Sequence, residues 1–161
     1  MEERKIDQRR RLNALVGALI RLATDRRILV LLALFLAYSV AVMRPAYRRI
    51  GTLSGGAGAI DFLIVYSPEQ VYDMMAAYGE HGRAFYATIA LTLDTIFPIA
   101  LASLSCLVLT YLFHRAFSRE DVLRRALLVP AVAMCADLLE NVGIVTMLLT
   151  YPERLPTVVL L

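Results

Sequence analysis

Three long runs of apolar residues dominate the hydrophobic pattern of the chain. They occupy residues 28–43, 84–113 and 126–150, and polar or charged segments separate them. About 20 apolar residues at 1.5 Å each cross a hydrocarbon core of about 30 Å, so such runs predict membrane-spanning helices. The first run is short, with 16 uncharged residues. We expect the arginines at its ends to reach the membrane surface with their long side chains.

A basic segment, residues 1–27, precedes the first run. It holds eight Lys and Arg residues against four acidic ones, which predicts a cytoplasmic N-terminus. Apolar residues recur in it at helical spacing and predict an amphipathic helix on the membrane surface. A basic tail without an ordered helix is the alternative. The apolar positions are Leu12, Leu15, Val16, Leu19, Leu22 and Ala23.

Residues 44–83 are expected on the outer side of the membrane. Glycines between positions 51 and 58 indicate a flexible loop. Ser67 followed by Pro68 is a typical helix start, and Gly79 is expected to end that helix. This short helix is predicted to lie on the bundle or the headgroups, and the apolar residues on one of its faces are Val71, Met74, Met75 and Tyr78.

Composition supports a membrane protein over a soluble one. The 161 residues are 59% hydrophobic, with a mean hydropathy of +0.63 and no Trp. The formal net charge of +3 is concentrated in the N-terminal segment, so a nucleic-acid partner is not indicated. Cys106 and Cys135 have neither CxxC nor metal-ligand spacing, and they are expected to pack as small apolar residues.

The pattern therefore predicts an all-α integral membrane protein of the inner cell membrane. We expect a basic amphipathic segment over 1–27 and a transmembrane helical bundle over 28–161. The loop Arg115–Arg125 has four arginines against two acids and is expected in the cytoplasm. The five apolar residues after Pro156 look like the start of a fourth helix. The bundle is therefore expected to have three visible spans and a fourth that is truncated.

Acidic residues lie inside the second and third runs. Asp94 is the single charge of the second run, and Pro98 follows it by four residues. Asp137, Glu140 and Asn141 lie at positions i, i+3 and i+4, so they share one helix face. Asp94 and Glu140 each lie ten residues from the outer end of their run, or roughly 15 Å. Antiparallel helices would therefore bring these groups to one depth.

The second and third runs contain no Lys, Arg or His to offset these acids. Ionised, unpaired carboxylates are costly in a low-dielectric layer. We therefore expect protonation, a bound cation, a water-filled cavity or a basic residue from elsewhere, such as Arg83 or Arg154. Pro98 lacks an N–H, which leaves the Asp94 carbonyl oxygen as a further oxygen ligand. The alternative is that the acids and Asn141 hydrogen-bond between helices and fix their packing.

An ordered set of short motifs resembles a family of small bacterial four-helix membrane proteins. The resemblance covers about residues 60–160 and implies a fourth span after Pro156 that carries a basic residue. The family offers no activity to transfer, and the chain has Ser67 and Tyr78 where the family has Thr and Trp. The matching residues are Asp61, Ser67-Pro68-Glu69, Tyr78-Gly79, Gly82-Arg83, Leu93-Asp94, Phe97-Pro98 and Asp137-Leu138-Leu139-Glu140-Asn141.

The expected function is an acidic intramembrane pocket that binds a cation or a small amphiphilic, lipid-like ligand. One alternative is a structural or assembly factor that docks transmembrane helices of a partner membrane protein. The other is a lipid-modifying membrane enzyme that uses paired carboxylates. The bilayer is the expected surrounding, and no cofactor or metal is identified. The residues assigned to the pocket are Asp94, Asp137, Glu140 and Asn141, with Arg83 and Asp61 at its mouth.

Overall fold

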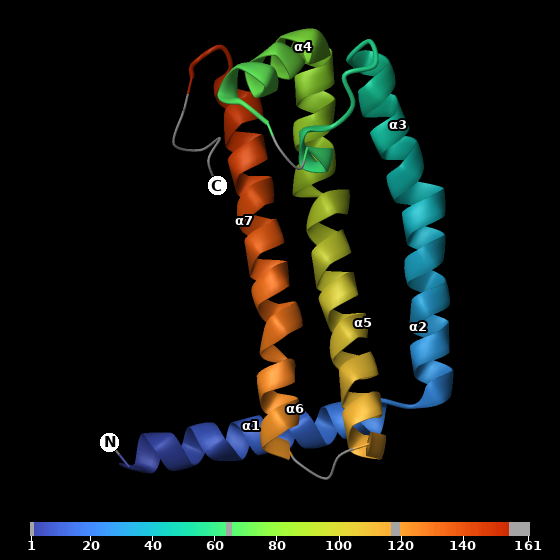
Figure 1. The fold of residues 1–161 in the computed structure, drawn as a ribbon, viewed down its shortest axis with the longest axis vertical. Coiled ribbons are helices and arrows are strands. Elements are labelled where there is room, and N and C mark those ends of the chain that lie inside the picture. The colour runs from blue at the N-terminus through green and yellow to red at the C-terminus, as the bar shows by residue number, and fades with distance from the viewer. Residues whose placement is uncertain (1, 64–65, 117–119, 155–161) are drawn as a thin grey trace. The chain divides into compact units, whose positions relative to one another are not determined.

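The computed structural model describes residues 2–63, 66–116 and 120–154 (Figure 1). Every regular element in these ranges is helical, which confirms the predicted all-α class. Two of the elements are short irregular turns, a π-helical turn η1 and a 3₁₀ turn η2. The elements are α1 (Glu2–Leu22), α2 (Asp25–Tyr38), η1 (Ser39–Met43), α3 (Arg44–Leu53), η2 (Ile60–Phe62), α4 (Pro68–Leu91), α5 (Leu93–Ala116), α6 (Glu120–Ala126) and α7 (Leu128–Thr150).

The chain divides into two compact units, each made from two separated stretches. The first unit combines residues 1–35 with 100–134, and the second combines 36–99 with 135–161. All the residues that the sequence assigns to the pocket belong to the second unit.

Three stretches are long and apolar enough to cross a membrane, as the sequence predicts. They are Asp25–Leu53, Pro68–Arg115 and Leu128–Thr150. The prediction of a short first helix over 28–43 is corrected, because this stretch has 29 residues. The helix continues through η1 into α3, where Arg44 is the first residue and Pro45 the second. Proline disturbs a regular α-helix, and a wide turn accommodates it.

The helix start predicted at Ser67 is confirmed. The Ser67 hydroxyl oxygen accepts a hydrogen bond of 3.2 Å from the backbone N–H of Gln70, and Pro68 occupies the first turn. Gly79 interrupts α4 with φ +63° and ψ −179°, a conformation that favours glycine. The segment from Pro68 to Tyr78 is therefore a short helix of its own, although the helical assignment continues to Leu91.

The core of the second unit lies on the predicted apolar face of this short helix. The four residues of this apolar face are buried and pack with buried residues of α3 and α7. Tyr86, from the part of α4 after Gly79, is fully buried and meets the ring of Tyr78 edge-on at 5.4 Å between centroids. The predicted face consists of Val71, Met74, Met75 and Tyr78, and its partners include Ala46, Ile50, Ile144, Met147 and Leu148.

In the first unit, α1 lies crosswise to α2 (Figure 1). A helix covers Glu2–Leu22 of the basic segment, while its amphipathic character and its position on a membrane surface stay predictions. No residue of α2 is buried within the chain. The expected fourth helix after Pro156 lies outside the described residues.

Candidate functional site

The second unit contains a pocket of about 590 Å³ between α3, η2, α5 and α7. Arg44 and Arg48 of α3 line the pocket, and so do the apolar residues Met43, Phe62 and Phe97. Carboxyl groups form most of the remaining polar lining, and they belong to Asp61, Asp94, Asp137 and Glu140.

Asp94 lies in the first turn of α5 and is buried. Its backbone carbonyl oxygen accepts a hydrogen bond of 3.2 Å from the side-chain amide of Asn141, which is also buried. Pro98 has no N–H to donate to this carbonyl oxygen, which the sequence therefore predicts to be a free acceptor. In the structure, Asn141 of α7 donates to it. Counting residues from the outer ends of the two runs predicts that Asp94 and Glu140 lie at the same depth. In the structure Asp94 contacts Asn141, the residue next to Glu140. Asn141 acts here as a link between helices.

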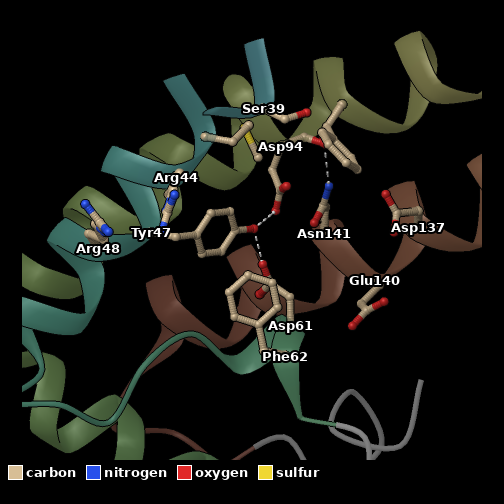
Figure 2. Close-up of a pocket in the computed structure, with 12 residues that line it drawn as sticks. Ser39, Arg44, Tyr47, Arg48, Asp61, Phe62, Asp94, Asp137, Glu140 and Asn141 are labelled. Atoms are coloured by element: carbon tan, nitrogen blue, oxygen red, sulfur yellow. Dashed lines mark hydrogen bonds between the residues drawn. The ribbon is translucent and has the colours of Figure 1, made fainter. Parts of the chain in front are cut away.

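A hydrogen-bonded chain of tyrosines and aspartates includes three of the lining residues of the pocket. The Tyr47 hydroxyl lies between a carboxyl oxygen of Asp94, at 2.7 Å, and a carboxyl oxygen of Asp61 (Figure 2). The ring of Phe62 packs against the Tyr47 ring, with 4.8 Å between centroids. We call Asp94, Tyr47, Asp61 and Tyr86 the carboxyl–tyrosine chain, because Tyr86 binds the other carboxyl oxygen of Asp61.

The Tyr86 hydroxyl also holds the backbone of η2. Its oxygen accepts the N–H of Ile60 at 3.0 Å and the N–H of Asp61 at 3.4 Å. On another side of Asp94, the Tyr38 hydroxyl donates to the Leu93 carbonyl oxygen at 2.6 Å. The tyrosines therefore position the backbone beside the buried Asp94 and the half-buried Asp61.

Asp137 and Glu140 face the same pocket from α7 and are exposed. Neither carboxyl group forms a hydrogen bond or an ion pair with another described residue. In Figure 2 both lie on the side of Asn141 away from Tyr47. Asp137 and Glu140 are therefore the two pocket carboxyl groups that have no hydrogen-bond or ion-pair partner among the described residues.

The two residues expected at the pocket mouth have different surroundings. Asp61 lies within the carboxyl–tyrosine chain. Arg83 is not among the lining residues; its guanidinium donates to the Met75 carbonyl oxygen at 3.1 Å and lies 4.2 Å from the Tyr151 ring centroid. Arg154, the other arginine considered, lies 5.3 Å from the ring centroid of Tyr72.

Sequence reasoning missed the contribution of α3 to the site. Arg44, Tyr47 and Arg48 have the same i, i+3, i+4 spacing as the acidic group on α7, so a signal was present. Hydropathy marks Arg44 only as the end of an apolar run, and this obscures the spacing. Figure 2 shows the two arginines on the side of Tyr47 opposite Asn141.

Among the described residues, no group of three or more His, Cys, Asp or Glu side chains could hold a metal ion. The geometry instead offers separate carboxylates beside an apolar wall. No known protein family, curated protein or solved structure matches the chain. Its function is therefore inferred from the pocket itself.

Proposed function

We propose that the chain is a multi-pass protein of the inner cell membrane and that its pocket binds an amphiphilic organic cation, such as a lipid-like amine. The observation that carries this proposal is the lack of a partner for Asp137 and Glu140 within a helix apolar enough to span a membrane. Ionised carboxylates at such positions are costly and are typical of ligand or ion sites. A bound ammonium group offsets this cost.

The apolar part of the pocket supports an amphiphile. Met43, Phe62 and Phe97 offer a surface for a hydrocarbon chain beside the acids. The volume of about 590 Å³ lies within the range of small-molecule sites, roughly 300–1,000 Å³. The absence of a metal-holding group among the described side chains favours an organic cation over a metal ion.

In this proposal the N-terminus is cytoplasmic and α1 lies on the inner membrane surface. The basic composition of residues 1–27 supports this orientation. The short helix that begins at Pro68 then lies at the outer surface, and the pocket opens toward that side.

Octylammonium is the probe that tests the proposal, because it combines one positive charge with a short alkyl chain. We expect it to raise the unfolding midpoint of the protein in detergent micelles. At a hundredfold excess over Kd the stabilisation of a single site is about 2.7 kcal/mol. Octanol, which has the chain without the charge, and ethylammonium, which has the charge without the chain, should each have a much smaller effect.

The matched variants separate the pocket from general charge effects. The double variant Asp137→Asn/Glu140→Gln should lose most of the octylammonium effect. The control Asp73→Asn/Glu153→Gln removes the same two side-chain charges at exposed positions outside the pocket lining and should retain it. An equal response of both double variants, or an equal effect of octanol, would show that the pocket does not bind the amine.

A further inference from the structure

The Tyr47 hydroxyl contacts two carboxyl groups but has only one hydrogen. Its oxygen lies within hydrogen-bonding distance of a carboxyl oxygen of Asp94 and one of Asp61. The hydroxyl donates to one of them. The other contact is a hydrogen bond only when that carboxyl carries a proton and donates it to the Tyr47 oxygen.

Tyr86 cannot supply the missing hydrogen. Its oxygen accepts the backbone N–H groups of Ile60 and Asp61, so its own hydrogen points to the carboxyl of Asp61. The carboxyl–tyrosine chain therefore has three contacts between phenols and carboxyls, while the two phenols provide two hydrogens. The third hydrogen belongs to Asp61 or Asp94.

The other charged groups near the carboxyl–tyrosine chain are consistent with a proton on Asp61 or Asp94. Asp137 and Glu140 on α7 add negative charge to the same pocket and favour a protonated neighbour. The guanidinium groups of α3 lie on the far side of Tyr47 from these acids (Figure 2). The titratable or charged groups on the elements packed around the chain are Tyr38, Arg44, Arg48, Tyr78, Tyr86, Asp137 and Glu140.

We propose that Asp94, Tyr47 and Asp61 share one exchangeable proton and that an organic cation entering the pocket displaces it. This inference rests on the proposed function and extends it from binding to exchange. One O–H bond of a carboxyl group breaks, the proton passes to water or buffer, and the carboxylate keeps the electron pair. The ammonium ion keeps all its hydrogens, and no oxidation or reduction takes place.

Exchange leaves the charge of the pocket unchanged, because one positive charge enters as another leaves. The four lining carboxyls can then accept the cation without an additional uncompensated charge. Proton uptake on release of the cation completes the reverse step.

Asparagine substitutions separate the exchangeable proton from the hydrogen-bonded chain. In Asp94→Asn the amide N–H donates to the Tyr47 oxygen, and Tyr47 donates to an ionised Asp61. In Asp61→Asn the amide donates to Tyr47, Tyr47 donates to an ionised Asp94, and the amide oxygen accepts from Tyr86. Each variant satisfies all three contacts without an extra proton. Both should therefore fold and lack the exchangeable proton.

The test is calorimetric titration of octylammonium into the full chain in detergent at neutral pH, in two buffers with different heats of ionisation. The difference in binding heat between the buffers counts released protons. We expect about one proton per bound amine for the wild type and for the exposed control Asp73→Asn, and about none for Asp94→Asn and Asp61→Asn.

The outcomes distinguish the exchange from the binding function. Wild-type binding without proton release would overturn the exchange and leave the proposed function intact. No octylammonium binding by the wild type would overturn both. Proton release that persists in both asparagine variants would place the proton outside the carboxyl–tyrosine chain. If a variant fails to fold, the infrared band of a protonated carboxyl in the wild type decides, since the amine should abolish it.

Discussion

The side-chain amide of Asn141 donates a hydrogen bond of 3.2 Å to the backbone carbonyl oxygen of Asp94. Pro98 creates this acceptor inside α5, because it has no N–H for the carbonyl four residues before it. The asparagine on α7 occupies the acceptor and is itself buried. One proline and one amide therefore tie two long helices together beside the pocket.

Removing this link should destabilise the protein. Asn141→Ala is expected to lower the free energy of unfolding by about 1 kcal/mol, because the Asp94 carbonyl loses its partner. Pro98→Ala restores an N–H to the helix, so Asn141→Ala should cost less in that background. A double-mutant cycle measured by unfolding in detergent checks this coupling. Additive costs would mean that the amide and the proline act independently.

Two glycines should respond to alanine in opposite directions. Gly79 has φ +63° and ψ −179°, and a Cβ there would meet no atom within 4 Å. The cost of Gly79→Ala is therefore backbone strain, about 1–3 kcal/mol of unfolding free energy. Gly51 lies within α3 and also has open space around it. Gly51→Ala should stabilise by about 0.5–1 kcal/mol, and thermal unfolding of the pair measures the contrast.

The Tyr86 hydroxyl should contribute more to stability than an exposed one. Tyr86→Phe leaves two backbone N–H groups and one carboxyl oxygen of Asp61 without this partner. We expect a loss of about 2 kcal/mol or more. Tyr66→Phe, at an exposed position, should change the unfolding free energy by less than about 0.5 kcal/mol. Similar losses in both variants, measured in denaturant, would argue against the role of Tyr86 in holding η2.

Labelling of single cysteines tests the proposed topology. In a chain with Cys106 and Cys135 replaced by Ala, cysteines at Ala57 and Glu153 should react with an impermeant maleimide in intact cells. A cysteine at His114 should react only after the cells are opened, because basic residues flank that cytoplasmic end. All three positions are exposed in the structure. Reaction of all three from one side would contradict the topology.

The features that sequence predicted well depend on local chemistry. Long apolar runs determine where helices can form, and the short helix is bounded by the Ser67 cap and by Gly79, each of which acts within a few residues. The pairing of α5 with α7 was also predictable to within one residue, because Asp94 and Glu140 lie at equal depths in antiparallel runs. These properties follow from spacing along one helix or from a simple count of residues.

The other wall of the pocket depends on contacts between distant segments. Arg44 ends an apolar run, but a helix ends only where its backbone hydrogen bonds stop, so hydropathy gave the wrong end for the first helix. Asp61 reaches Tyr47 because Tyr86, 25 residues further along the chain, holds the backbone of η2. No local pattern encodes a contact of that separation. Motif and periodicity analysis therefore assigned Asp61 and Asp94 to the pocket but could not show that Tyr47 and Tyr86 join them.

The π-helical turn Ser39–Met43 sets the rotational phase of α3. A wide turn contains one residue more than an α-helical turn, and each residue of an α-helix rotates the chain by about 100°. The same residues wound as a regular α-helix would swing Tyr47 away from Asp94 and Asp61 by about that angle. Loss of one residue within this turn would remove the excess and preserve the phase. With the π-helical turn, Tyr47 therefore points into the pocket. With a regular α-helical turn of the same residues, it would point away from the pocket.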